Sequence, residues 1–214
     1  MSVLEIAIRK VKKGQLDAFM AARSAFIAEL KKQDGVQVDR EFQSFYALPA
    51  PDDTEVFVGM TLWDSPEAAG AAAQKLMGMD VAQNFFATFD FKAYVMVAPP
   101  AGFDLAALAS TAGQVLEVAV REVTDHEAFA ATKPAFIELL TSQEGMLEDY
   151  EFEVLAVGLT GENNPNVKVG MSVYESQEAF QKIAGMIMQD GATQAYFATF
   201  NPVAVQYAFS TDNS

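Results

Sequence analysis

Four charged residues recur at matching places in two halves of the chain, and their spacing suits acid–base chemistry. Glu5 and Arg9 return as Glu117 and Arg121. Residues two or four apart on a strand share one face, so each carboxyl would lie on the same face as a guanidinium. Such a set could orient an anionic substrate or move a proton, with the arginine lowering the pKa of a carboxyl. The same residues could instead pair structurally across an interface between the halves, and their repetition favours that interpretation.

A pair of acidic residues also occurs once in each half of the chain. Asp39 and Glu41 return as Asp149 and Glu151. Because residues i and i+2 of a strand share a face, each pair should project together. The pairs would either join the arginines in an interior acid–base set or line an acidic rim.

Aromatic residues end one strand of each half. Trp63 and Tyr174 could stack on a ring of a ligand, although an aromatic residue at this place more often belongs to the core. Gly59 and Gly170 lie in the middle of the same strands, where glycine marks a bulge or a close ligand approach, and the bulge is favoured. No catalytic residue is assigned. The candidate ligand-binding residues are Glu5, Arg9, Trp63, Glu117, Arg121 and Tyr174.

The chain offers few ligands for a metal or a cofactor. His126 is the only histidine and there are no cysteines, so thiolate and multi-histidine sites are excluded. His126 could act as a general base, but its place at a helix start favours an exposed first-turn residue. No glycine-rich phosphate loop is present. We therefore expect no metal and no cofactor.

Composition limits the partners. Hydrophobic residues make up 51% of the 214 residues, and the formal net charge is −15. Nucleic acid and anionic membrane surfaces would be repelled. The absence of cysteine, of a signal-peptide core and of a membrane-spanning apolar run favours a cytoplasmic location.

The segments that must form the strands and helices positioning these residues occur twice in the sequence. VLEIAIRKV at 3–11 returns as VLEVAVREV at 115–123, and FVGMTLWDSPEA at 57–68 returns as KVGMSVYESQEA at 168–179. A repeat of this length is a domain rather than a solenoid unit. We expect a first repeat at 1–98, a linker at 99–113 and a second repeat at 114–210.

Periodicity predicts the same elements in both repeats. A strand with alternating apolar residues is followed by a helix, two strands, a second helix with a serine N-cap at Ser65 or Ser176, and a last strand at 91–97 or 203–209. Each repeat is thus a ferredoxin-like β-α-β-β-α-β unit of the α+β class. The linker should contain a short helix at 104–109, and the polar tail after Phe209 should fray.

A ferredoxin-like sheet carries helices on one face only, so its other face must be covered. Two repeats can pack these open faces together and close their edges into a barrel within one chain. We expect Leu4, Ile6 and Ile8 to face the helices, and Glu5 and Arg9 to point into the barrel. The protein would be a monomer with an internal pseudo-dimer, and further self-association stays open.

The segments WDSPEAA (63–69) and YESQEAF (174–180) resemble the strand-to-helix signature of the dimeric α+β barrel superfamily, most closely the antibiotic biosynthesis monooxygenase-like domains. The resemblance covers nearly all of both repeats, and it implies a fused dimer with a ligand cavity in each half. It also implies a wide range of activities, which include cofactor-free oxygenation, haem degradation, lactone isomerisation and dye peroxidation, and many similar proteins have no known activity. Many members carry a histidine on the second helix. Here Lys75–Met77 and Met186–Met188 occupy that region, which excludes haem ligation by histidine there.

Two functions fit this pattern. The chain could bind a small organic molecule, as a cofactor-independent monooxygenase-like or isomerase-like enzyme. Alternatively, it could be a non-catalytic structural or interaction domain whose barrel is filled by its own side chains. A cavity in the folded protein would favour the first.

Overall fold

The computed structural model describes residues 1–159 and 161–211. The first half consists of β1 (Val3–Val11), α1 (Leu16–Leu30), β2 (Val36–Leu48), β3 (Val56–Trp63), α2 (Pro66–Met77), α3 (Asp80–Phe86) and β4 (Phe89–Ala98). The second half repeats this order with β5 (Val115–Val123), α4 (His126–Thr141), β6 (Met146–Val157), β7 (Val167–Tyr174), α5 (Gln177–Ile187), α6 (Gly191–Phe197) and β8 (Phe200–Ser210). The predicted order of elements is confirmed, with one helix more in each half.

The additional helices, α3 and α6, lie between the predicted second helix and the last strand of each half. Gly78 is the C-cap residue of α2, and in the second half the Asp190 carboxylate accepts a hydrogen bond from Ala192 N to begin α6. The last strands consequently start at Phe89 and Phe200, two or three residues earlier than the alternation indicated.

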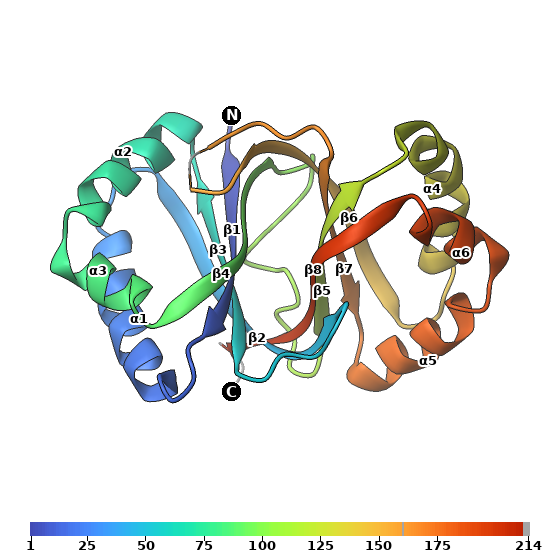
Figure 1. Ribbon diagram of the computed structural model, residues 1–214, viewed down its shortest axis with the longest axis horizontal. Coiled ribbons are helices and arrows are strands. Elements are labelled where there is room, and N and C mark those ends of the chain that lie inside the picture. The colour runs from blue at the N-terminus through green and yellow to red at the C-terminus, as the bar shows by residue number, and fades with distance from the viewer. Residues whose placement is uncertain (160, 212–214) are drawn as a thin grey trace.

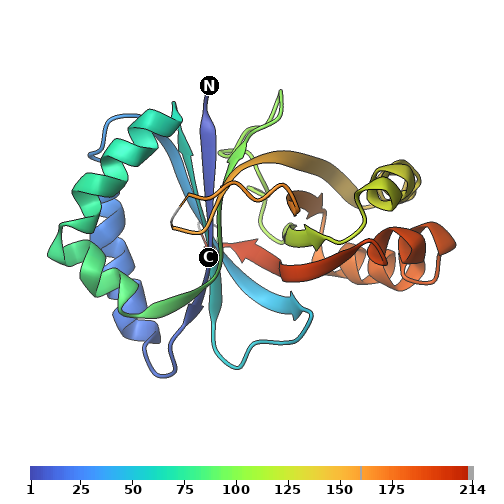
Figure 2. The same ribbon diagram turned by 45° about the horizontal axis from the view of Figure 1, so that its top comes forward.

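The eight strands close into one barrel in the order β1-β3-β2-β8-β5-β7-β6-β4. All neighbouring strands are antiparallel, and the pairs β2–β8 and β4–β6 join the two halves. The helices cover the outside, with α1, α2 and α3 on one side and α4, α5 and α6 on the other (Figures 1 and 2). This arrangement confirms the expected intrachain α+β barrel.

The barrel interior is filled, and this reverses one prediction. Leu4, Ile6 and Ile8 are fully buried in a single apolar cluster inside the barrel, together with their counterparts Leu116, Val118 and Val120. An eight-stranded barrel is only wide enough for side chains to fill it, and branched aliphatic residues do so here. Glu5 and Arg9 therefore lie on the outer face, beneath the helices. The prediction that they point into the barrel was wrong.

The segment between the halves closes one part of the barrel. Leu105 and Leu108 are buried within the interior cluster. They lie in turns, so the short helix predicted at 104–109 is absent. The Asp104 carboxylate instead accepts a hydrogen bond from Ala106 N at 2.9 Å, a local bond that competes with helix formation. The buried Arg40 guanidinium fixes this segment by donating to three carbonyl oxygens, those of Leu105, Ala106 and Leu108, at 3.1, 2.9 and 3.2 Å.

In each half, the end of one strand also packs against the apolar cluster of the other half. Phe45 of β2 packs into the apolar cluster of the second half, and Leu155 of β6 packs into that of the first. The connection from β6 to β7 reaches the first half, where Gly158 N donates to Tyr94 O of β4 at 2.8 Å (Figure 1). Ser210 still belongs to β8 and the Thr211 hydroxyl donates to Glu41 O, so this part of the tail is held, while 212–214 lie outside the described residues. Among the described residues no helix is long and apolar enough to cross a membrane.

Candidate functional site

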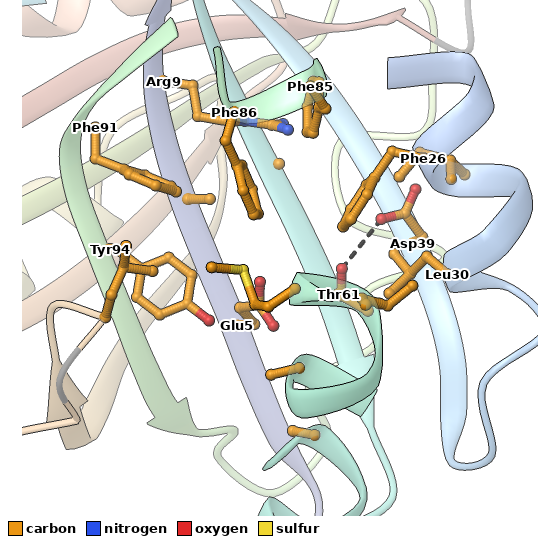
Figure 3. Close-up of a pocket in the computed structure, with 18 of the residues that line it drawn as sticks. Glu5, Arg9, Phe26, Leu30, Asp39, Thr61, Phe85, Phe86, Phe91 and Tyr94 are labelled. Carbon is orange, nitrogen blue, oxygen red and sulfur yellow. Dashed lines mark hydrogen bonds between the residues drawn. The ribbon is translucent and has the colours of Figure 1, made fainter. Parts of the chain in front are cut away.

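A cavity of about 180 Å³ lies in the first half, between the helices and the outer face of the sheet (Figure 3). Phe26 and Leu30 of α1 face it from one side, and Phe86 and Phe91 face it from the other. For comparison, a dry cavity of roughly 150 Å³ binds benzene. The cavity therefore has room for one or two rings.

The floor of the cavity is a row of three polar residues on adjacent strands. Thr61 of β3 is paired with Glu5 of β1 on one side and with Asp39 of β2 on the other. Cross-strand neighbours are about 5 Å apart, so the two carboxyl-bearing residues are about 10 Å apart across the row. The Thr61 hydroxyl donates to Asp39 Oδ1 at 3.1 Å. Thus both carboxyls face one space from opposite ends of this row.

Glu5 is held by two aromatic donors. Trp63 Nε1 donates to Glu5 Oε2 at 3.3 Å, and the Tyr94 hydroxyl also donates to this carboxylate. Burial raises the pKa of Glu5, and the two donors offset part of that rise. Glu5 is half-buried and lines the cavity.

Asp39 is suited to exchange a proton near neutral pH. Burial raises its pKa to about 6, the Glu41 carboxylate adds to the rise, and Arg23 and Thr61 oppose it. The nearest atoms of Arg23 and Asp39, Nη2 and Oδ2, are 3.7 Å apart. Asp39 is therefore mostly ionised at pH 7 and mostly protonated below pH 6. Its counterpart Asp149 also has a raised pKa, chiefly through burial.

The arginine of the repeated set has a structural partner. Arg9 Nη2 contacts both carboxylate oxygens of Glu41 at 2.7 Å, and Arg23 Nε donates to the same carboxylate. The matching Arg121 pairs with Glu151 at 3.0 Å. Each pair thus lies within one half, which corrects the expectation of Glu–Arg pairing across the interface.

The two mid-strand glycines belong to these ion pairs. A Cβ at Gly59 would overlap the Arg9 guanidinium, and a Cβ at Gly170 would stand 2.7 Å from Arg121 Nη2. No register shift occurs at either glycine in the pairing with β1 or β5. The glycines therefore let an arginine cross the strand, and the bulge interpretation was wrong.

The second half places the matching residues in a packed aromatic cluster. The Tyr174 hydroxyl donates to Glu117 Oε2 at 2.7 Å, and Tyr174 is 3% exposed. The ring of Phe180 lies against Tyr207, with centroids 4.2 Å apart. Of the six predicted ligand-binding residues, Glu5, Arg9 and Trp63 line the cavity, whereas Glu117, Arg121 and Tyr174 belong to the other half.

His126 takes no part in this site. It is the exposed first residue of α4, and its Nε2 lies 2.8 Å from Asn166 Oδ1. Within the described residues no three His, Cys, Asp or Glu side chains are grouped to hold a metal ion.

Sequence reasoning missed the aromatic residues that β4 contributes. Phe91 and Tyr94 both face the cavity although they are three residues apart. The pairing of β1 with β4 shifts between Ile8 and Arg9, which leaves Lys92 as an extra residue. This bulge breaks the alternation. The dense aromatic run at 85–94 was the signal available in the sequence.

Comparison with solved structures identifies the fold. A putative monooxygenase from Fusobacterium nucleatum is 12% identical with a TM-score of 0.58, and the match covers 98% of this chain and 92% of that one. An anthrone oxidase-like protein is 9% identical with a TM-score of 0.69, covering 98% and 91%. A putative chlorite dismutase is 7% identical with a TM-score of 0.58, covering 99% and 95%. The chain therefore has the dimeric α+β barrel fold. No protein-family model and no curated protein matches its sequence.

Proposed function

We propose that the protein binds a small organic molecule of one or two rings in the first-half cavity, and that Asp39 accepts a proton from it. The observation that carries this proposal is the placement of two carboxyls, Glu5 and Asp39, on the floor of a cavity with aromatic and aliphatic walls. Apolar pockets with a few convergent polar groups of perturbed pKa are the usual form of small-molecule sites.

The two carboxyls suit complementary roles. Asp39, mostly ionised at pH 7, is a base within reach of a ligand hydroxyl or an activated C–H group. Glu5, whose pKa burial raises, can hold a proton and donate a hydrogen bond to a ligand oxygen. Proton removal from the ligand is a first step common to isomerisation and cofactor-independent oxygenation. The structural likeness to a putative monooxygenase and an anthrone oxidase-like protein supports this class of reaction.

We further propose that the chain is a fused pair of barrel subunits, residues 1–98 and 114–210 joined by 99–113, which acts as a monomer. Separating the halves would leave the barrel-facing side of β1 uncovered and the edges of β2 and β4 unpaired. The isolated residues 1–98 should therefore self-associate in size-exclusion chromatography. A monodisperse, cooperatively folding monomer would contradict the proposal.

The alternative, a non-catalytic domain, draws support from the filled barrel interior. That observation fits a structural role for the barrel and for the packed second half. It does not account for the carboxyls that face an open space beneath α1 and α2.

Binding can be tested with 4-bromophenol, and bromobenzene serves as the ligand control without a hydroxyl. Calorimetric titration between pH 5 and 8 should show 4-bromophenol binding more tightly as the pH rises through about 6, because ionised Asp39 accepts the hydroxyl proton in a hydrogen bond. Asp39→Asn should remove this pH dependence, and the matched Asp149→Asn should retain it. Equal behaviour of the two variants would overturn the role of Asp39.

Proton removal can be followed with an enolisable ketone of similar size. In D₂O, the protein should accelerate deuterium incorporation at the carbon next to the carbonyl of 1-indanone, measured by NMR. Asp39→Asn should lose this acceleration while Asp149→Asn keeps it. Binding without any acceleration would leave a ligand-binding protein and reject the catalytic part of the proposal.

A further inference from the structure

We infer that ligand binding is confined to the first half, and that a small residue at position 69 keeps its cavity open. The inference rests on the proposed function. Ala69 begins the buried stripe of α2, is 3% exposed and lines the cavity. The corresponding residue in the segment YESQEAF is Phe180 of α5. One methyl group therefore stands where the other half has a phenyl ring.

The Phe180 ring packs against the two tyrosines that bond to Glu117, the carboxyl that corresponds to Glu5. Its centroid lies 4.2 Å from that of Tyr207 and 5.5 Å from that of Tyr174. The hydroxyls of these two tyrosines both bond to Glu117. Glu117 thus accepts hydrogen bonds from two protein donors, as Glu5 does, but both of its donors pack against the Phe180 ring. In the first half Ala69 stands in place of that ring, and Glu5 lines the cavity.

The strand end that packs over the opposite half also carries larger side chains where it covers the second half than where it covers the first. Phe45 and Tyr46 of β2 lie over the second half, each with its ring centroid 6.4 Å from that of Phe180. The residues at the matching places of β6 are Leu155 and Ala156, and Leu155 packs against the first half. Two independent elements thus supply large rings to one half and smaller side chains to the other. The protein should take up one ligand per chain.

Two methionines report on the two halves separately. Met77 lines the first-half cavity at the end of α2, and Met188 is the C-cap residue at the same place on α5. Met60 and Met171 are buried inside the barrel and indicate whether a variant is folded. Carbon-13 labelling of the methionine methyl groups therefore gives a matched set of NMR probes, since a bound aromatic ring shifts nearby methyl resonances.

The experiment is a titration of the full chain with 4-bromophenol. In the wild type the Met77 methyl should shift with a stoichiometry of one, and the Met188 methyl should stay. Ala69→Phe should weaken the Met77 response at least tenfold, whereas the control Ala71→Phe, at an exposed residue of α2 outside the cavity lining, should keep it. Phe180→Ala should add a second saturable shift, at Met188.

The outcomes separate this inference from the proposed function. Retention of the Met77 response in Ala69→Phe, or a wild-type response at Met188, overturns the inference alone. If Ala69→Phe does not fold, as judged by the Met60 and Met171 methyls, Phe180→Ala decides, and no Met188 response in that variant overturns the inference. No methyl response in the wild type overturns the proposed function and the inference with it.

Discussion

The guanidinium of Arg9 passes over Gly59, a residue of the neighbouring strand, to reach Glu41 on the strand beyond. The missing side chain of Gly59 is what leaves room for this path. The same relationship between Arg121 and Gly170 occurs in the second half. Gly59 thus leaves room for a buried guanidinium beside the cavity, and the Glu41 carboxylate holds that guanidinium in place.

Gly59→Ala should lower the free energy of unfolding by about 2–4 kcal/mol, because the new methyl group displaces a buried, doubly hydrogen-bonded guanidinium. Gly70→Ala is the matched control, since a Cβ at Gly70 of α2 meets open space. That change should stabilise by up to about 1 kcal/mol through helix propensity. Urea denaturation measures both, and a Gly59→Ala variant as stable as the wild type would refute the argument.

Arg9→Met should lower the free energy of unfolding by about 3–5 kcal/mol, because Glu41, with 3% of its side chain exposed, would lose one of the two arginines that pair with it and keep Arg23. Replacing Glu41 by Met as well should cost less than the sum of the two single changes. A double-mutant cycle in urea gives the coupling energy. Additivity within about 0.5 kcal/mol would show that the two residues are not coupled.

Asp39→Asn should stabilise the protein at neutral pH while impairing ligand binding. The pKa of Asp39 is about 6 in the folded chain against an ordinary value of 3.8. Between these values the folded state holds a proton that the unfolded state has lost, so the contribution of Asp39 to stability falls as the pH rises from about 4 to 6. The full difference is about 3 kcal/mol. Denaturation at pH 4, 5, 6 and 7 should show the advantage of Asp39→Asn growing over this range, and parallel curves for the two proteins would contradict it.

Arg40→Met should release the segment between the halves. Arg40 donates to three carbonyl oxygens of that segment and to Ser210 Oγ at 2.8 Å. Its loss would leave buried carbonyl groups without these donors, at a cost of about 2–4 kcal/mol. Limited proteolysis should then cut within 99–113 faster than in the wild type. Unchanged cleavage would show that burial of Leu105 and Leu108 holds the segment without Arg40.

Most of the fold could be predicted from the sequence, because the hydrophobic periodicity indicates the same strands and helices in both copies of the internal repeat. The alternation at 3–11 and the serine N-caps Ser65 and Ser176 located strands and helices in both halves. The same alternation identifies two faces of a strand without telling which one faces the barrel. Both faces of β1 are covered, one by the apolar side chains that fill the barrel and one by helices. Apolar residues alone therefore did not distinguish them, and Leu4 was assigned to the wrong side.

The site was predictable only in part. Glu5 and Trp63 were named from repetition and residue type, and both line the cavity. Tyr94 was missed because a bulge in β4 breaks the period of two. The difference between Ala69 and Phe180 is visible in the paired segments. Its effect on the cavity can be inferred only when the position of α2 above the sheet is known.

Binding in the first-half cavity alone can be seen directly in an X-ray structure of the wild-type chain with 4-bromophenol, in which anomalous scattering locates the bromine. We expect one bromine peak beneath α1 and α2, with the phenol oxygen within about 3 Å of a carboxylate oxygen of Asp39 or Glu5. We expect no bromine peak beneath Phe180. A ligand inside the barrel, equal occupancy of both halves, or an empty first-half cavity at saturating 4-bromophenol would contradict this expectation.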